Sequence, residues 1–234
     1  RELGFTLPHE HVLVDFGGAE TASPDRYDAD EVVERMLPHL QLAKAAGIDA
    51  FVDCTPMYLA RDVGVLGRLS DLTDLHIITN TGQYKEPFLP RRTLEYAADD
   101  ARSGTTRGAR ALSEEWIAEW HGGIDGTRVR PGFIKTAVFG TALAPAQQTV
   151  ITAAALTSRA TGLPVGTHTE SGVAALHTLR TLGRHGVPAE RWIYIHAHTE
   201  PDHQLVLMAA RAGAWIELDG IGGTKDETVL ALLL

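Results

Sequence analysis

The sequence predicts an α/β protein, a (β/α)8 TIM-type barrel truncated after about seven βα units. Short apolar runs alternate with longer amphipathic stretches along the chain, as in a series of βα units with a parallel sheet. Polar residues also recur at the C-terminal ends of the apolar runs, where barrels place their active sites. An open doubly wound sheet has the same element order, but it would spread these residues across its width, whereas a closed barrel brings them together.

Seven strands are expected, several of them apolar throughout, as in strands covered on both faces. They are Gly4–Val14, Asp49–Thr55, Leu75–Thr81, Gly132–Val138, Pro164–Thr169, Trp192–Ala197 and Ala214–Asp219. Helical spacing predicts helices over Ala29–Ala46, Ala144–Ala160, Glu170–Arg184 and Pro201–Ala212. Residues 81–130 are expected to be largely irregular, with short helices at Pro90–Ala101 and Ser113–Trp120. Because no linker interrupts the series, residues 1–234 are interpreted as one domain.

Composition excludes several classes of function. The chain has 234 residues and a formal net charge of −9, which argues against nucleic acid as the main partner. No apolar run approaches the roughly 18 residues that a membrane-spanning helix needs, so no membrane partner is expected. The single cysteine, Cys54, excludes an intrachain disulfide and fits a reduced, cytoplasmic setting. The sequence does not decide the oligomeric state, and a homodimer is one of the states it allows.

Both ends of the chain are interpreted as cut. Arg1 directly precedes a strand-like run, and the final ETVLALLL has the pattern of a helix start without an end signal. We therefore expect the C-terminal βα unit to be missing. An open seam would then lie between the last strand and the first.

Histidines gather at the predicted strand ends. Residues i and i+2 of a strand point to the same face, so His9 and His11 in LPHEHV would project side by side and could clamp one metal ion. His168 and His196 each end another strand. A satisfied core histidine is the more common role for either one alone, but in barrel order the set indicates a metal site. His198 shares a face with His196 by the same rule and is treated as a neighbour.

Lys135 lies in the middle of the apolar strand GFIKTAV, where lysine is rare. One interpretation is a side chain that reaches solvent from the strand end. The other is a buried, neutral amine that reacts with carbon dioxide. The resulting carbamate would be an anionic group able to bridge two metals.

These segments resemble the phosphotriesterase family of the amidohydrolase superfamily, and its phosphotriesterase-related, lactonase-like branch in particular. The resemblance rests on GFTLPHEHV, FVDCTP, NTGQY, FIKTAV, GTHTESG and IHAHTEPD followed by GAWIELDGIG. It implies that His9 and His11 bind the more buried metal, that Lys135 is the carboxylated bridge, and that His168 and His196 bind the more exposed metal. The family also has a ligand aspartate at the end of strand 8, which this chain does not reach. Asp219 ends strand 7 by count and does not take that place.

The resemblance further implies two divalent metal ions and a metal-bridging hydroxide that cleaves a lactone or carboxylic ester. Zinc is expected, although manganese, cobalt and iron also suit such ligands. Phosphotriester hydrolysis and a metal-binding, non-catalytic barrel are the alternatives. Tyr84, at the end of strand 3, is a candidate acid for the leaving group and otherwise a wall residue. Lys85, Arg91 and Arg92 could hold an anionic group, with solvated loop charges as the more common role.

Overall fold

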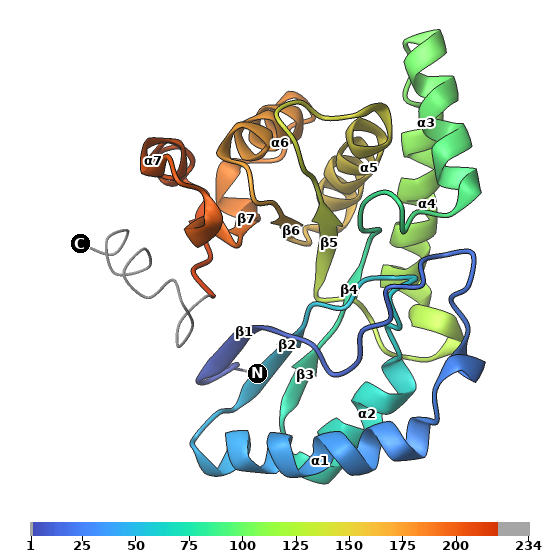
Figure 1. Ribbon diagram of the computed structural model, residues 1–234, viewed down its shortest axis with the longest axis vertical. Coiled ribbons are helices and arrows are strands. Elements are labelled where there is room, and N and C mark those ends of the chain that lie inside the picture. Colours follow the sequence, from blue (N-terminus) through green and yellow to red (C-terminus); the bar gives the residue numbers. More distant parts are fainter. Residues whose placement is uncertain (1, 220–234) are drawn as a thin grey trace.

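Parallel strands alternate with helices in the computed structural model of the chain, which describes residues 2–219 (Figure 1). Within this range the strands are β1 (Thr6–Glu10), β2 (Ala50–Asp53), β3 (His76–Ile78), β4 (Asn80–Thr81), β5 (Phe133–Ala137), β6 (Val165–His168), β7 (Trp192–Ile195) and β8 (Trp215–Ile216). All seven predicted strands are present, and each is shorter than expected. The predicted third strand is divided at Thr79 into β3 and β4.

The strands pair in chain order, as expected for successive βα units. One sheet has the order β1-β2-β3 and the other has the order β4-β5-β6-β7-β8, with every pair parallel. Because all strands run the same way, their C-terminal ends lie at the same end of the molecule.

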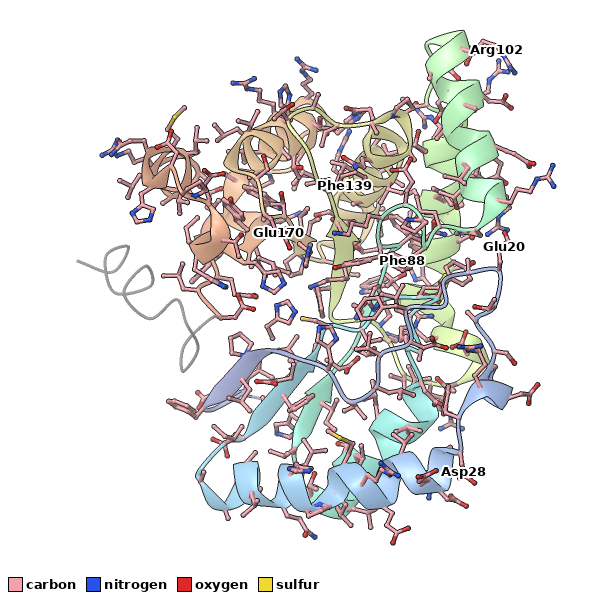
Figure 2. All side chains as sticks on the ribbon, viewed as in Figure 1. Glu20, Asp28, Phe88, Arg102, Phe139 and Glu170 are labelled. Carbon is pink, nitrogen blue, oxygen red and sulfur yellow. The ribbon has the colours of Figure 1, made fainter. Side chains whose placement is uncertain are left out.

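Helices cover the outer faces of both sheets (Figure 1). They are α1 (Ala29–Ala45), α2 (Val63–Thr73), α3 (Arg91–Ser103), α4 (Arg107–Gly122), α5 (Pro145–Thr161), α6 (Gly172–Arg184) and α7 (His203–Arg211). Asp28 begins α1 by accepting the N–H groups of Asp30 and Glu31 (Figure 2). One apolar cluster joins α1 and α2 to the first sheet through side chains such as Leu40 and Leu69.

Two helical predictions are corrected. Helix α2 was not predicted, although Asp62 caps its first turn and Leu66 and Leu69 are buried. Residues 107–112, which precede the predicted helix Ser113–Trp120 and were expected to be irregular, instead begin α4, since the buried Asp100 carboxylate accepts the N–H groups of Gly108 and Ala109. The predicted helix at the very end of the chain lies outside the described residues.

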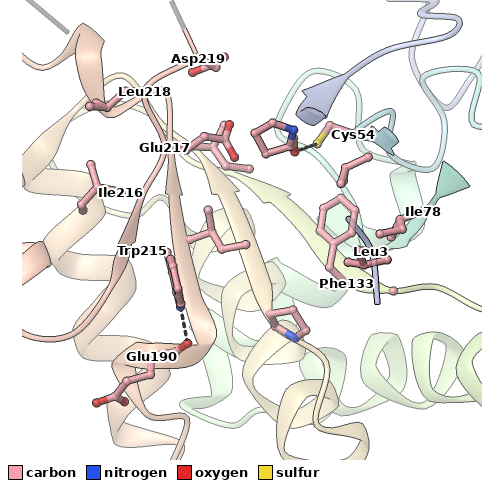
Figure 3. A pocket seen from close by; sticks show the side chains of 16 residues that line it. Leu3, Cys54, Ile78, Phe133, Glu190, Trp215, Ile216, Glu217, Leu218 and Asp219 are labelled. Atoms are coloured by element: carbon pink, nitrogen blue, oxygen red, sulfur yellow. Dashed lines mark hydrogen bonds between the residues drawn. The ribbon is translucent and has the colours of Figure 1, made fainter. Parts of the chain in front are cut away.

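Strands β1 and β8 stand at the two ends of the series. Among residues 2–219, β1 pairs with β2 and β8 pairs with β7, and neither pairs with the other. Side chains of both strands line a mostly apolar cavity of about 540 Å³, called here the inner cavity (Figure 3). Phe133 and Ile78 lie on one side of it, and Trp215 and Glu217 on the other. The missing βα unit remains a prediction.

A buried ion pair joins the two sheets where the third strand is divided. Arg61, in the loop after β2, donates to both carboxylate oxygens of Glu119 on α4 at 2.7 and 3.0 Å, and to the carbonyl of Asn80 at 2.8 Å. The Thr81 hydroxyl donates to the same carboxylate at 2.5 Å. The side chain of Arg61 is only 3% exposed, so this charge depends on its partner.

Replacing Glu119 with Gln should therefore lower the free energy of unfolding by about 3 kcal/mol, because it leaves the buried guanidinium with only the exposed carboxylate of Asp125, 3.8 Å away, as its counter-charge. Urea unfolding measures the change. The double variant Arg61→Met with Glu119→Leu should lose less than Glu119→Gln alone. Glu31→Gln, which removes an exposed pair with Arg35, is the control and should have little effect. Equal losses in Glu119→Gln and Glu31→Gln would contradict the assigned role.

Candidate metal centre

The five predicted ligands lie together at the C-terminal ends of the strands. His9, His11, Lys135, His168 and His196 line one cavity of about 340 Å³, the histidine cavity, and Tyr84 lies on its wall. His9 is in β1 and His11 just beyond it, while Lys135 is in β5, His168 ends β6 and His196 follows β7. The site therefore takes side chains from both sheets.

His9 and His11 project side by side, as the strand spacing predicts. Their Nε2 atoms are 3.3 Å apart. The Nδ1 atom of His11 lies 2.9 Å from the Thr55 hydroxyl, whose own proton is donated to the carbonyl of Leu13 at 3.0 Å. Thr55 therefore accepts the Nδ1–H of His11, and the Nε2 of His11 carries a lone pair.

Two carboxylates after β8 orient two further rings. His9 donates Nδ1–H to Glu217 at 2.5 Å, and His196 donates Nδ1–H to Asp219 at 2.6 Å. Burial raises the pKa of Glu217 to about 7. Burial would also raise the pKa of Asp219, but the hydrogen bond from His196 and the nearby imidazoles lower it to about 2. Each ring thus keeps a proton on Nδ1 and a lone pair on Nε2.

His168 completes the ring of imidazoles. Its Nε2 is buried and makes no hydrogen bond within the described part of the chain. The ring packs edge-on against His196, with centroids 4.5 Å apart, and against Tyr84 at 5.3 Å. Burial, followed by the charges of His196 and Lys135, lowers the pKa of His168 to about 2.

The imidazoles are neutral and suited to bind a cation. Burial is the main cause that lowers the pKa values of His9 and His11 to about 3, with neighbouring cationic groups adding to it. Two nitrogen lone pairs at 3.3 Å repel each other unless a cation or a proton lies between them. Neutral imidazole nitrogens are the form that binds metals. The residues present therefore fit a metal centre.

Lys135 is buried at the base of this cavity. It is 1% exposed, so the interpretation of a lysine that reaches solvent is wrong. Its Nζ lies 3.5 Å from the Nε2 of His9. Within residues 2–219 it forms no ion pair with a carboxylate.

Comparison with known proteins agrees with this geometry. The phosphotriesterase family matches residues 1–228 of the sequence. The chain belongs to the phosphotriesterase family. This confirms the family that the sequence motifs indicate, and with it a hydrolase of the phosphotriesterase type.

Individual members of the phosphotriesterase family match most of the chain. The phosphotriesterase homology protein of Escherichia coli K12 is 29% identical, over 98% of this chain and 75% of that protein. An aryldialkylphosphatase of Saccharolobus solfataricus is 26% identical, over 100% of this chain and 73% of that protein. The structure of a mutant PTE-like lactonase from Deinococcus radiodurans has a TM-score of 0.83 at 29% identity, over 99% of this chain and 73% of that chain. These matches confirm the barrel fold.

The backbone at His196 differs from the extended strand that the sequence predicts there. Strand β7 ends at Ile195, and His196 has a left-handed φ of 63° before a short 3-10 helix, Ala197–Thr199. The i, i+2 rule therefore does not apply, and His198 does not share the face of His196. The Nδ1 of His198 lies 3.4 Å from Asp219, outside the histidine cavity, so its prediction as a neighbour is consistent with the structure.

Glu217, the carboxylate beside His9, was not predicted as a site residue. Ligand atoms of His9, His196, Glu217 and Asp219 all lie within 4.8 Å of one another. Glu217 and Asp219 are two residues apart, the same spacing that made His9 and His11 recognisable, so the signal was present in WIELD. Strand β8 is the seventh predicted strand, because the third is divided into β3 and β4. The aspartate that the family has after one further strand is therefore not among residues 2–219, and Glu217 and Asp219 provide the carboxylates on that side of the site.

Tyr84 lies where the phosphotriesterase-family resemblance places a candidate acid. Burial, followed by the charge of Glu170, raises the pKa of its hydroxyl, so the side chain keeps its proton at neutral pH. It can therefore donate a hydrogen bond toward the cavity.

None of the helices described between residues 2 and 219 is long and apolar enough to cross a bilayer.

The metal-free protein should lose stability as the pH falls below about 6.5. Folded-state pKa values of about 3 for His9 and His11 and about 2 for His168 lie below the ordinary 6.5, so these rings take up protons on unfolding. Glu217, whose pKa is raised from 4.5 to about 7, releases one proton in the same range. Asp53, whose pKa burial raises from 3.8 to about 6, releases most of another proton, so a net uptake of about one proton near pH 5.5 gives a slope of roughly 1.5 kcal/mol per pH unit. Urea unfolding in chelator between pH 5 and 7.5 measures it, and a flat profile would contradict neutral imidazoles.

Proposed function

We propose that this chain is a binuclear metal hydrolase that cleaves a lactone or a carboxylic ester. The observation that supports the proposal is the convergence of Nε2 lone pairs from His9, His11 and His196 beside the buried Lys135. The Nε2 of His9 lies 3.5 Å from the Nζ of Lys135 and 3.3 Å from the Nε2 of His11, and divalent cations would satisfy these lone pairs.

The proposed ligands divide between two metal ions, most suitably zinc. His9 and His11 hold one ion, His168 and His196 hold the other, and Lys135 in its carboxylated form bridges them. Burial of Lys135 without a carboxylate partner supports this form, because a neutral amine is the species that reacts with carbon dioxide. When bound, the two ions supply an activated water and polarise the ester carbonyl.

The chain's own residues orient and shield this chemistry. Glu217 and Asp219 accept the Nδ1 protons of His9 and His196, which keeps the Nε2 atoms directed at the metals. Tyr84 holds its proton within reach of a leaving group. Val14 and Leu59 are apolar wall residues of the histidine cavity, and they exclude water from the bound substrate.

A lactone or carboxylic ester is the first candidate substrate, and a phosphotriester is the second. The first is supported by the lactonase named among the solved structures, and the second by the aryldialkylphosphatase among the relatives. A carboxylic ester and a phosphotriester are both uncharged, so either one would bind at the same position in the histidine cavity. A metal-binding barrel without catalytic activity is the third reading, and the same assays separate all three.

Zinc-loaded protein should hydrolyse lactones or aryl carboxylic esters faster than phosphotriesters, and removal of the metal by chelator should abolish the activity. The Lys135→Ala variant should lose at least about 100-fold in kcat/KM and retain fewer metal ions, since it removes the bridge. Activity and metal content are measured on the same samples. His39→Ala, on α1 away from the cavity, is the matched control. Full activity in Lys135→Ala would reject the bridging role, and metal binding without any hydrolysis would favour the non-catalytic reading.

Replacing Glu217 with Gln should weaken the affinity for one of the two metals by about 10- to 100-fold. The amide keeps the shape of the side chain but no longer provides the charged acceptor for the Nδ1–H of His9. Competition with a chromogenic chelator measures the affinity without reference to catalysis. Glu190→Gln, a change at the far end of the inner cavity, serves as control. An unchanged affinity in Glu217→Gln would mean that the hydrogen bond to His9 does not orient a ligand.

A further inference from the structure

Lys85 has an unusual environment for a loop lysine. It directly follows Tyr84 in the loop after β4 and is half-buried. Its Nζ lies 5.5 Å from the ring centroid of Tyr84 and 5.6 Å from that of Phe139. The ammonium therefore sits against two aromatic rings and makes no ion pair within residues 2–219.

This position adjoins the wall of the histidine cavity. Tyr84 is a wall residue of that cavity, and its ring packs against both His168 and Phe88, with centroids 5.3 and 5.9 Å apart. Phe88 in turn packs against Phe16 at 5.6 Å. Figure 2 shows Phe88 and Phe139 among the side chains at the strand ends.

The other cations of this region are already paired. Arg91 donates to Glu95 at 2.9 Å with its side chain 85% exposed, and Arg92 donates to Glu115 at 2.8 Å. The sequence grouped these two arginines with Lys85 as candidates for an anionic group. The structure separates them, because of these three cations only Lys85 adjoins the cavity wall and lacks a carboxylate partner among the described residues.

We propose that Lys85 binds an anionic group, a carboxylate or a sulfonate, carried by the substrate at the end away from the scissile ester. The inference rests on the proposed hydrolase function and specifies its substrate class. Aromatic faces offset only part of the cost of partly desolvating an ammonium, and an anion would supply the remaining counter-charge. The neighbouring rings would contact the apolar part of the substrate between its charge and its ester. An ammonium is a compact point charge, so it accepts either type of anion.

The test compares two esters that differ only in charge: mono-4-nitrophenyl adipate and the same compound with its free carboxylate methylated. The ratio of their kcat/KM values, anionic over neutral, is measured for the zinc-loaded protein and its variants. Lys85→Met keeps the stem against the rings but removes the charge, and it should lower the ratio about ten-fold, mainly through KM for the anionic ester. Lys85→Arg should retain most of the preference. Arg91→Met removes one charge from the adjacent helix and should leave the ratio unchanged.

An unchanged ratio in Lys85→Met, or an equal fall in Arg91→Met, would overturn the proposal while leaving the hydrolase intact. If neither ester is hydrolysed, the lactone and aryl ester assays above decide the proposed function, and binding decides the role of Lys85. In that case butane-1-sulfonate should raise the Tm of the zinc-loaded protein more than butan-1-ol with matched sodium chloride. The rise should disappear in Lys85→Met and persist in Arg91→Met. No rise, or the same rise in wild type and Lys85→Met, would overturn it.

Discussion

The hydrogen bonds donated by the Nδ1 atoms of His9, His11 and His196 determine which nitrogen of each ring faces the cavity. Their acceptors are Glu217, the Thr55 hydroxyl and Asp219. Each acceptor uses up the only ring proton of a neutral imidazole, so each Nε2 has a lone pair and nothing to donate. Without these acceptors the rings could turn or change tautomer and satisfy one another. With them, the Nε2 lone pairs are available to accept from Lys135, which lies 3.5 Å from His9, or to bind a metal cation.

This arrangement depends on the relative position of two sheets. His9, His11 and Thr55 belong to the β1–β3 side, whereas His168, His196 and Lys135 come from the β4–β8 side. The two sheets meet where Thr79 divides the third strand. The Arg61–Glu119 pair spans this division, because Arg61 follows β2 and also binds the carbonyl of Asn80 in β4. A buried ion pair whose side chains do not line the histidine cavity thus helps to set the distance between the two groups of ligands.

The sequence predicted the strands and the residues at their ends, because a period of two and a sharp end to an apolar run are local signals. It did not predict α2, whose Gly64 and Gly67 weaken the helical pattern and whose apolar face is fixed by contact with α1. Nor could it predict the left-handed backbone at His196, which removed His198 from the expected face. Glu217 was missed for another reason: its spacing from Asp219 was visible in the sequence, but its partner His9 lies 208 residues earlier and meets it only when the fold places Glu217 just beyond β8.

The charges around the histidine cavity are also unevenly placed. The carboxylates of Glu217 and Asp219 lie on the β8 side, against His9 and His196. On the β4 side the wall is formed by Tyr84, and Lys85 stands just outside it. The exposed carboxylate of Glu170 lies 4.0 Å from the Nε2 of His168, so attraction on the second side is confined to the surroundings of Lys85. A substrate whose anionic end contacts Lys85 would keep that charge away from Glu217 and Asp219 and direct its ester toward the centre. The same orientation brings the leaving group or the acyl chain past Tyr84, a proton donor whose hydroxyl stays protonated at neutral pH.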